Sequence, residues 1–378
     1  MITTTFVVAI VCLLAIALIA PSFDSTPKNG VAKPFNDGWY IEYDNGGREP
    51  FSSFGKSINQ DRIVLIHAHD DDLNRIDALG LYNYYSAVEV YVGEKLIYSY
   101  GSMDDINNHV NLGNYYSMID IHRHEMAESE IRLVFMNDNP QTIYGFTGGN
   151  GGALEMALVR EYIVTILTPL VSVIFLIIAV YLRIRNRYTD SLSPSNKWLL
   201  IFALTLSTWE LADSQILMDM GCDAGSVCLL SFEIFMLIPV PLLMFTYYSC
   251  RKLRRLSLYM CAVLFLNFVV LNVLNFTHIV EFLYSLVSTH IVVFISLLLC
   301  FIQIMSEYNS KQDLRNTVML GGYCVFGVSA VLQYLQFFIN PSSSNSRIMQ
   351  LGILMFLISQ GAMISYSVIQ KNSQIVRR

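Results

Sequence analysis

Two histidines and an aspartate in the stretch "LIHAHDDDLNR", residues 65–75, have the types and spacing of metal ligands. His67 and His69 stand two apart, which in a strand points both side chains to one face, and Asp71 follows two residues later. A binuclear hydrolytic site of this spacing would need a further histidine where Asp72 stands. We therefore favour a polar strand face that runs into a solvated acidic turn, over a cation site or a catalytic site.

Other signatures of catalysis are missing from the sequence. There is no paired nucleophile and base, no phosphate-binding loop and no cofactor fingerprint, so we predict no catalytic residues, no enzyme activity and no cofactor. The net charge of -6 and the lack of a long basic block argue against nucleic acid as a partner.

Tyrosines are numerous between residues 82 and 116. Most of them are expected to pack in a core or across strands, because aromatic rings bury a large apolar area. Exposed rings also stack on sugars, and for such a ligand surface our choices are Tyr84, Tyr98 and Tyr100.

Three carboxylates lie in or beside long apolar stretches, where ionisable groups are costly and often functional. Glu210 and Asp213 are a turn apart near the end of one stretch, and Glu233 lies about one turn into the next. They either form an acidic pocket or reach water at the membrane interface, and we favour the interface. Pro239 and Pro241 remove two backbone hydrogen bonds from the following helix and should kink it.

The elements that must position these residues fall into two parts. The chain has 378 residues and only 14% charged residues, against about 25% in a typical soluble domain. Residues 22–156 are polar and acidic, whereas residues 157–370 hold seven apolar stretches long enough to cross about 30 Å of hydrocarbon. The stretches are residues 159–182, 197–217, 228–249, 256–276, 282–305, 316–338 and 347–370. Residues 371–378 then form a short tail.

The apolar run at residues 5–20 is either a cleaved signal peptide or an uncleaved first span, and we favour an uncleaved anchor within residues 1–21. Both alternatives place residues 22–156 outside the cytoplasm. The predicted outer loops hold only Arg347, whereas thirteen basic residues flank the inner connections and the tail. These are Arg183, Arg185, Arg187, Lys197, Arg251, Lys252, Arg254, Arg255, Lys311, Arg315, Lys371, Arg377 and Arg378. We read them as topology signals of a multi-pass protein in the cell membrane.

Residues 38–136 have the alternation and the β-branched and aromatic residues of strands. The segments are "GWYIEY", "RIVLIHAH", "SAVEVYV", "EKLIYSYG" and "SEIRLVFM". Residues 86–101 predict a hairpin with a two-residue turn at Gly93 and Glu94. Several short antiparallel strands predict a β-sandwich or jelly roll for the outer domain.

The seven cysteines all lie outside this strand-rich region, so it must fold without disulfides. Cys222 and Cys228 share one predicted outer loop, where an oxidising compartment would allow a small disulfide. The spacing leaves open whether they pair.

Two segments of the strand-rich region resemble known sugar-binding modules. The order "VEVYVGEKLIYSYG", then "YYSMIDIHRHEMAESEIRLVF", is similar to galactose-binding-like jelly rolls. With seven helices following, the chain resembles bacterial seven-transmembrane receptors with diverse intracellular signalling modules. Trp209, Asp213 and Ser214 match that family's W-x-x-x-D-S pattern, and "LIPVP" at residues 237–241 matches its L-x-P-x-P pattern.

The resemblance covers about residues 35–370 and implies an outer carbohydrate-binding-like domain and a signalling output inside the cell. Members of that family usually continue into an enzyme or DNA-binding module, and here only "QKNSQIVRR" follows the last helix. We therefore expect the output to come from a separate cytoplasmic signalling protein or from a module missing in this sequence.

The first hypothesis is a sensory receptor, which binds a carbohydrate or another small molecule outside and signals to a cytoplasmic partner, in a homodimer embedded in membrane lipid. The second is a transporter or membrane enzyme whose outer domain delivers substrate, which predicts a polar path at mid-bilayer and an inverted repeat. The third is a non-signalling protein of adhesion or envelope assembly.

Overall fold

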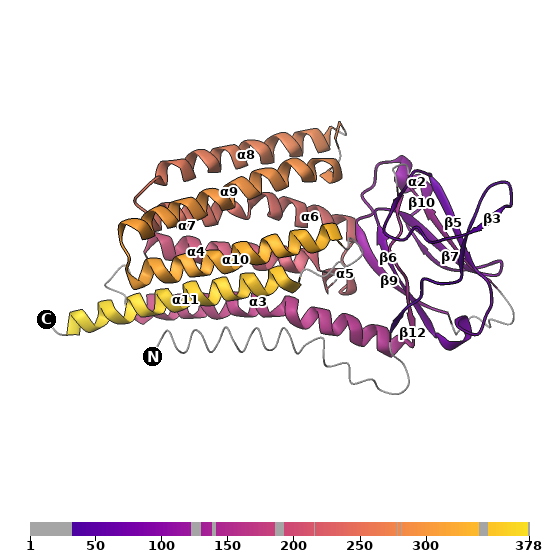
Figure 1. Ribbon diagram of the computed structural model, residues 1–378, viewed down its shortest axis with the longest axis horizontal. Coiled ribbons are helices and arrows are strands. Elements are labelled where there is room, and N and C mark those ends of the chain that lie inside the picture. The colour runs from indigo at the N-terminus through magenta and orange to yellow at the C-terminus, as the bar shows by residue number, and fades with distance from the viewer. Residues whose placement is uncertain are drawn as a thin grey trace.

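The computed structural model describes residues 32–121, 130–137, 141–185, 193–214, 216–277, 279–280, 282–339 and 347–376. Figure 1 shows two parts in line, a strand-rich part and a bundle of long helices whose near ends meet one of the sheets. The predicted anchor within residues 1–21 lies outside the described residues. The same is true of three of the basic topology residues, Arg187, Arg377 and Arg378.

One sheet of the strand-rich part has six antiparallel strands. In order across the sheet they are β3 (Arg48–Pro50), β2 (Trp39–Glu42), β5 (Arg62–His67), β10 (Ile131–Met136), β7 (Ala87–Val92) and β8 (Lys95–Tyr100). The predicted hairpin is confirmed, because β7 and β8 pair across a two-residue turn at Gly93 and Glu94. Gly93 has a φ of 58°, which glycine adopts without a steric cost.

A second antiparallel sheet packs on the first. Its strands, in order, are β1 (Lys33–Pro34), β12 (Thr147–Gly149), β6 (Ala78–Tyr84) and β9 (Asn114–Asp120). The two sheets share one apolar core, to which β6 contributes Leu79 and Leu81 and β7 contributes Val88 and Val90, all fully buried. Smaller elements complete this part, namely the pair β4 (Ser57–Ile58) and β11 (Gln141–Thr142), η2 (Leu73–Arg75) and α2 (Met103–Asn107). The antiparallel β class predicted from the sequence is thus confirmed.

Strand β6 has different residues on its two faces. Because side chains alternate along a strand, Leu79 and Leu81 enter the core while Gly80, Tyr82 and Tyr84 lie on the opposite face. That face looks toward the helix ends (Figure 1). Period-two alternation therefore places tyrosines where the two parts of the molecule meet.

The helical part begins at Gly151, earlier than the boundary predicted at residue 157. Asn150 accounts for the difference, since its side-chain oxygen accepts a hydrogen bond of 2.9 Å from the backbone of Gly152 and so caps the helix. The helices are α3 (Gly151–Arg185), α4 (Pro194–Asp213), α5 (Ile216–Asp219), α6 (Ala224–Leu237), α7 (Pro239–Ser249), α8 (Arg254–Phe276), α9 (Phe282–Ser310), α10 (Leu314–Ile339) and α11 (Arg347–Val376).

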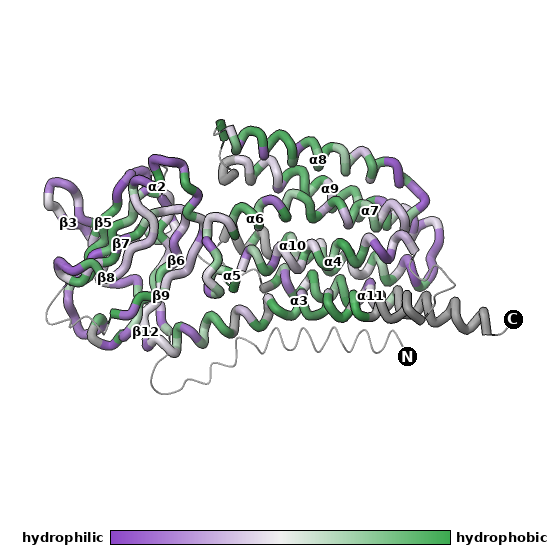
Figure 2. Tube along the Cα trace, turned by 180° about the vertical axis from the view of Figure 1, so that it is seen from behind, coloured by the Kyte–Doolittle hydropathy of each residue, from purple (hydrophilic) through white to green (hydrophobic). Residues whose placement is uncertain are grey.

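Among the described residues, three helices are long and apolar enough to cross a membrane, at Ala224–Ser249, Arg254–Phe276 and Val287–Ser310. Figure 2 shows hydrophobic residues along α8 and α9 and hydrophilic ones at the loop from α7 to α8. Large apolar side chains such as Phe265 and Phe294 are more than half exposed on these helices, as in a surface that lipid covers. The crossing of the membrane by α3, α4, α10 and α11 stays a prediction.

The two prolines interrupt the helix that contains them. Helix α6 ends at Leu237 and α7 begins at Pro239, with Ile238 between them. Pro239 and Pro241 are both buried and have no N–H to donate to the carbonyl groups of the preceding turn. Ile238 itself keeps right-handed helical dihedral angles, so the interruption is one residue long, and the kink expected from the prolines stays a prediction.

Candidate functional site

The strand-rich part and the helices meet backbone to backbone. A methyl group on Gly225, in the first turn of α6, would lie only 1.8 Å from the carbonyl oxygen of Asn111. A methyl group on Gly113, which precedes β9, would lie 2.5 Å from the carbonyl oxygen of Ala224. Gly113 also has a φ of 65°, in the left-handed region that favours glycine. Glycine at these two positions is thus what permits the close docking.

Tyr85 links the two parts beside this contact. Its hydroxyl hydrogen-bonds the Cys228 sulfur on α6 at 3.0 Å, and its backbone N–H donates to the Gly113 carbonyl at 2.9 Å. Tyr85 has a φ of 53°, which is uncommon for a residue with a side chain and costs on the order of 1 kcal/mol. Asn137 holds it there by donating its side-chain amide to the Tyr85 carbonyl at 3.0 Å. Burial, together with Cys228, raises the pKa of Tyr85 well above its usual value.

Tyrosine rings gather on the helix-facing side of β6. Tyr144 lies edge to face with Tyr82 at 5.6 Å and with Tyr84 at 5.7 Å between ring centroids, and Tyr84 and Tyr85 are 4.9 Å apart. The three rings of Tyr82, Tyr84 and Tyr144 are half-buried, so each keeps some accessible surface. Burial raises the pKa of Tyr84 to about 12, which keeps its phenol neutral at physiological pH.

The Asp213 carboxylate faces this group of tyrosines. It ends α4, is exposed, and accepts a hydrogen bond of 3.1 Å from the Ser231 hydroxyl on α6. Burial and the negative charge of Asp213 both raise the pKa of Tyr82. Among the described residues Asp213 has no cationic partner. The junction thus combines aromatic faces with a carboxylate that has no cationic partner among the described residues. These groups can stack on a ligand and accept hydrogen bonds from its hydroxyl or ammonium groups.

The three tyrosines proposed from the sequence do not share one surface. Tyr84 lies at the junction, but Tyr98 and Tyr100 point between the two sheets. The Tyr98 hydroxyl bonds the Ser117 hydroxyl at 2.7 Å, and the Tyr100 hydroxyl donates to the Leu112 carbonyl at 2.6 Å. Cross-sheet packing explains this orientation, because Tyr98 pairs with Val90 and Tyr100 pairs with Val88 on the inner side of β7.

Glu210 is a second unusual carboxyl group, deeper in the helices. It is 2% exposed and lies beside the Thr168 hydroxyl of α3. Within the described part of the chain, neither carboxylate oxygen of Glu210 nor the Thr168 hydroxyl has a hydrogen bond of ordinary geometry. One turn away, the hydroxyls of Ser172 and Ser207 bond each other at 2.6 Å. The contact between α3 and α4 is therefore lined by polar side chains that are only partly paired.

The three carboxylates do not form the acidic pocket that was the less favoured alternative. Glu210 faces α3, Asp213 faces Ser231 of α6, and Glu233 accepts a hydrogen bond of 3.2 Å from Asn272 of α8. The favoured alternative, in which all of them reach interfacial water, is wrong for the buried Glu210. Helix packing separates the three, because each side chain lies at a different helix contact.

Trp209 is half-buried next to Glu210 in sequence, and its ring packs on Phe235 of α6 at 5.7 Å between centroids. Phe235 in turn lies 5.0 Å from the His290 ring of α9. An aromatic row thus joins α4, α6 and α9 below the junction.

The structure does not bring together the three residues considered as metal ligands, which are His67, His69 and Asp71. His67 is 1% exposed, and its ring stacks on Phe35 at 4.8 Å, with ring nitrogens 2.8 Å and 3.1 Å from the carbonyl oxygens of Ala68 and Asp37. Its place in β5 follows the buried Ile63 and Leu65, so the alternation turns it inward. The polar strand face expected here is therefore wrong for His67.

The acidic turn after this strand has the expected form. Asp71 and Asp72 are exposed, and the Asp70 carboxylate accepts hydrogen bonds from the backbone of Asp72 and Leu73 at 3.1 Å and 2.8 Å. Within the residues that the structure describes, no three histidine, cysteine, aspartate or glutamate side chains are grouped to hold a metal, and the set of His67, His69 and Asp71 is no exception.

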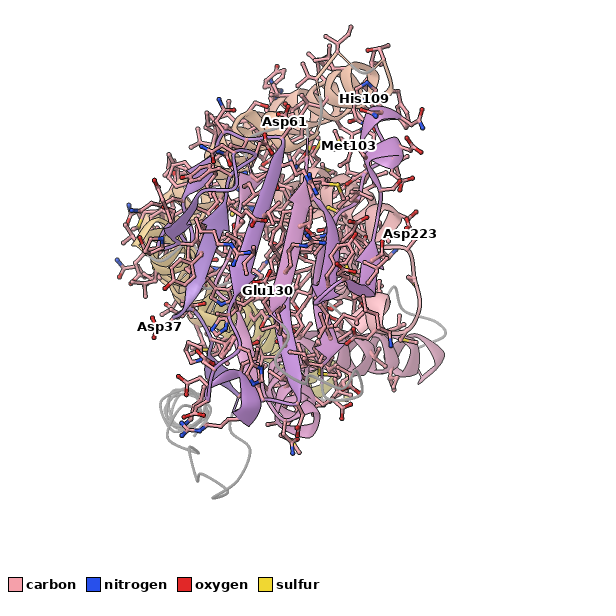
Figure 3. The ribbon with its side chains drawn as sticks, turned by 90° about the vertical axis from the view of Figure 1, so that its right-hand side faces the viewer. Asp37, Asp61, Met103, His109, Glu130 and Asp223 are labelled. Carbon is pink, nitrogen blue, oxygen red and sulfur yellow. The ribbon has the colours of Figure 1, made fainter. Side chains whose placement is uncertain are left out.

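Several charged side chains on the outer face of the six-stranded sheet contact one another or an aromatic ring. Arg48 bonds the Glu130 carboxylate at 3.0 Å and Glu42 at 3.2 Å, and Arg132 lies 4.6 Å from the centre of the Tyr91 ring. Figure 3 looks onto this end of the molecule, where Glu130 lies in the middle of the sheet and the labelled aspartates lie apart from it.

Cys222 and Cys228, whose pairing the sequence left open, are both free thiols. Cys222 is exposed, whereas Cys228 is buried in α6 and its sulfur is hydrogen-bonded to the Tyr85 hydroxyl. Secondary structure explains the separation, since α6 begins at Ala224 and places the two cysteines in different environments.

Sequence reasoning missed Tyr82, Tyr85 and Tyr144 as members of the junction. The signal was present for Tyr82, because the alternation of β6 sets it opposite the apolar Leu79 and Leu81. Tyr144 comes from a distant loop, and no local pattern shows that it meets β6.

Comparison of the chain with protein-family models and with curated proteins finds no match.

Proposed function

We propose that this protein is a membrane sensory receptor, in which a small molecule bound at the junction changes how the strand-rich part docks on the helices. The observation that supports it is the Asp213 carboxylate, which has no cationic partner among the described residues and lies beside the half-buried rings of Tyr82, Tyr84 and Tyr144. This group lies next to the close backbone contact between the two parts. A ligand there touches both parts at once, so its binding energy acts directly on their docking.

The ligand is a carbohydrate or another small molecule with hydroxyl or ammonium groups. The faces of the tyrosine rings stack on the apolar side of the ligand, while the Asp213 carboxylate accepts hydrogen bonds from its hydroxyl or ammonium groups. The resemblance to bacterial seven-transmembrane receptors supports this choice. In the same proposal the two sheets form an extracytoplasmic jelly roll, the helices cross the membrane seven times, and a homodimer passes the signal to a cytoplasmic protein.

Signalling requires that the ligand bind one docking arrangement better than the other. A complete switch, from 1:99 to 99:1, needs about 5.5 kcal/mol of differential binding, and a partial response needs less. The contacts that would change are the Tyr85 bond to Cys228 and the glycine contact of Gly225 with Asn111. Both lie at the start of α6, and α6 continues into the helix broken at Pro239.

The test is a thermal-shift screen of the full chain in lipid nanodiscs against a panel of sugars and organic amines. We expect at least one compound to raise the unfolding midpoint, and Asp213→Asn and Tyr84→Ala to remove the effect. Tyr40→Ala is the matched control, because Tyr40 is 40% exposed on the outer face of the six-stranded sheet. Loss of the shift in Tyr40→Ala as well, or retention in both junction variants, would overturn the junction as the site.

Vesicle uptake distinguishes the receptor from a transporter. A receptor binds its ligand without moving it, so the ligand should not accumulate inside sealed vesicles that contain the protein. Saturable accumulation that Asp213→Asn abolishes would replace the receptor by a transporter with the same binding site.

A further inference from the structure

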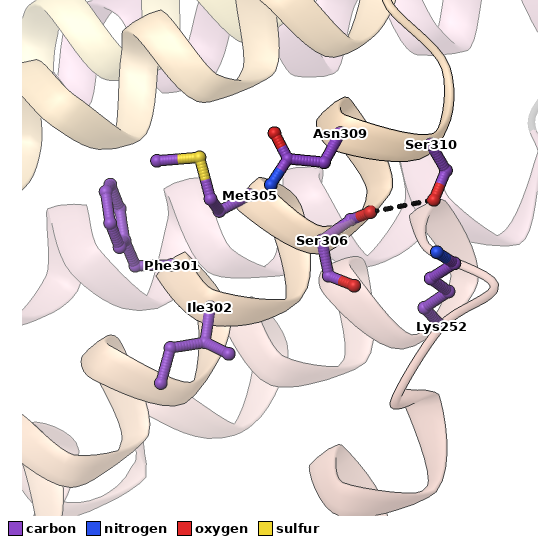
Figure 4. Close-up of a pocket in the computed structure, with 7 residues that line it drawn as sticks. All are labelled: Lys252, Phe301, Ile302, Met305, Ser306, Asn309 and Ser310. Atoms are coloured by element: carbon purple, nitrogen blue, oxygen red, sulfur yellow. Dashed lines mark hydrogen bonds between the residues drawn. The ribbon is translucent and has the colours of Figure 1, made fainter.

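A groove of about 350 Å³ lies along α9 at the end of the bundle far from the strands (Figure 4). Its apolar end is formed by Phe301, Ile302 and Met305, of which Ile302 is 46% exposed. Both α9 and its neighbour α8 are long and apolar enough to cross a membrane. This end of the groove therefore faces the acyl region of a bilayer.

The other end of the groove is polar. Ser306, Asn309 and Ser310 follow on the next turn of α9, and Lys252 reaches over them from the loop between α7 and α8 (Figure 4). The Ser310 hydroxyl donates to the Ser306 carbonyl at 3.0 Å. Within the described part of the chain, the Ser306 hydroxyl, the Asn309 amide and the Lys252 ammonium have no hydrogen-bond partner. Among the described residues, Lys252 has no carboxylate partner for its ammonium group.

Lys252 is held in place by its own loop. The Glu307 carboxylate of α9 accepts hydrogen bonds from the backbone N–H groups of Arg251 at 2.9 Å and Lys252 at 3.4 Å. Gln303 donates to the Leu253 carbonyl at 3.1 Å, and Leu253 has a φ of 56° that turns the chain sharply. The Glu307 carboxylate thus binds the loop backbone, and the Lys252 ammonium remains available for a ligand.

The loop also concentrates positive charge. Arg251, Lys252, Arg254 and Arg255 are four basic residues within five positions at the start of α8. Basic clusters beside a membrane helix attract anionic lipid, at about 1 kcal/mol for each lysine or arginine near the surface. The cluster therefore matches in charge a lipid whose acyl chain can enter the apolar end of the groove.

We propose that this groove binds a glycerophospholipid with an anionic headgroup. Its phosphate lies between Lys252, Ser306 and Asn309, and its acyl chain follows Phe301 and Met305. The site is independent of the ligand at the junction, because the two lie at opposite ends of the helices.

Native mass spectrometry of the full chain, released from neutral detergent and titrated with short-chain phosphatidylglycerol, tests the site. We expect one saturable lipid per chain, and about fivefold weaker binding in Lys252→Gln, equivalent to the loss of about 1 kcal/mol. Met305→Trp keeps every charge but fills the groove, and should weaken binding at least as much. Arg255→Gln removes the same charge outside the groove and should weaken binding less than Lys252→Gln does, because it removes general charge attraction but no contact inside the groove.

Two further titrations identify the source of the phosphate. Phosphatidylcholine of the same chain length should bind several-fold more weakly, and inorganic phosphate should neither saturate nor displace the lipid. Equal effects of Lys252→Gln and Arg255→Gln would reduce the interaction to general charge attraction and overturn the site. Saturation by inorganic phosphate that Met305→Trp does not affect would replace the lipid by a free anion, and would equally overturn the proposal.

Discussion

Gly225→Ala is the sharpest perturbation of the junction. Real side chains keep at least 3.0 Å from such a carbonyl oxygen, and the added methyl group would start at 1.8 Å from that of Asn111. The two backbones must therefore separate by at least 1.2 Å, the difference of these two distances, and the neighbour that must move is backbone. Overpacking of this kind typically costs about 1 to 3 kcal/mol. We expect this cost to appear as undocking of the two parts.

The buried Cys228 reports on undocking. Cys228 is 7% exposed and its thiol is hydrogen-bonded to the Tyr85 hydroxyl, so it reacts with a maleimide only when the junction opens. A loss of about 1 to 3 kcal/mol raises the open population about 5- to 150-fold, and labelling should accelerate accordingly. Peptide-level mass spectrometry of the labelled full chain separates Cys228 from the exposed Cys222. Cys222 should label at the same rate in both proteins.

Gly321→Ala supplies the matched control. It makes the same substitution in a helix, where an added methyl group meets nothing within 4 Å, so Cys228 labelling should not change. An unchanged labelling rate in Gly225→Ala, with the unfolding midpoint retained, would refute the glycine contact as the element that holds the junction closed. Faster labelling in both variants would show that helix stability, rather than docking, controls access to Cys228.

Three other outcomes are expected. Glu210→Gln should keep or raise the unfolding midpoint in detergent, because a buried carboxyl group without a hydrogen bond is costly, and a fall of several degrees would contradict this. Gly352→Ala should lower the unfolding midpoint, since the added methyl group would lie 2.2 Å from the Ser329 hydroxyl. Gly327→Ala, whose methyl group meets open space, should leave the midpoint unchanged. Equal midpoints in the two variants would contradict the close packing of α10 on α11. Burial raises the pKa of Tyr84 to about 12, whereas a tyrosine in the unfolded chain ionises near pH 10. The contribution of Tyr84 to the stability of the folded protein is therefore complete below about pH 10 and is lost as the pH rises toward 12. Absorbance titration at about 295 nm of the unsubstituted protein and of Tyr84→Phe checks this, because the difference between the two curves is the titration of Tyr84. A midpoint near pH 10 in that difference would contradict the raised pKa.

Local patterns predicted most of the secondary structure. Alternation identified β2, β5, β7, β8 and β10, and the two-residue turn set the register of the hairpin. Strand β6 was missed as a strand because Gly80 and Asn83 interrupt its apolar pattern. Gly80 is required there by tertiary packing, since a methyl group would meet the Tyr116 hydroxyl of β9 at 1.8 Å. Such a requirement becomes visible only once β6 and β9 are paired.

The candidate site was predicted in part. Asp213 and Tyr84 were both named from the sequence, one as a carboxylate at a helix end and the other as one of many tyrosines. Their meeting depends on the docking of the two parts, which rests on Gly113 and Gly225 and on the loop that carries Tyr144. Glycines give no pattern of their own, and residues 113 and 225 lie too far apart for any local period to connect them.

A junction with so few bonds is suited to regulation by a small molecule. The described contacts across it include the hydrogen bond between Tyr85 and Cys228, whose net contribution is about 0.5 to 1.5 kcal/mol, a contact of Cys228 with the Asn114 backbone, and close backbone packing. A ligand that favours one docking arrangement by a hundredfold supplies about 2.7 kcal/mol, more than that bond. In the proposed receptor, a bound sugar or amine of this selectivity thus supplies more free energy than the hydrogen bond between Tyr85 and Cys228 contributes.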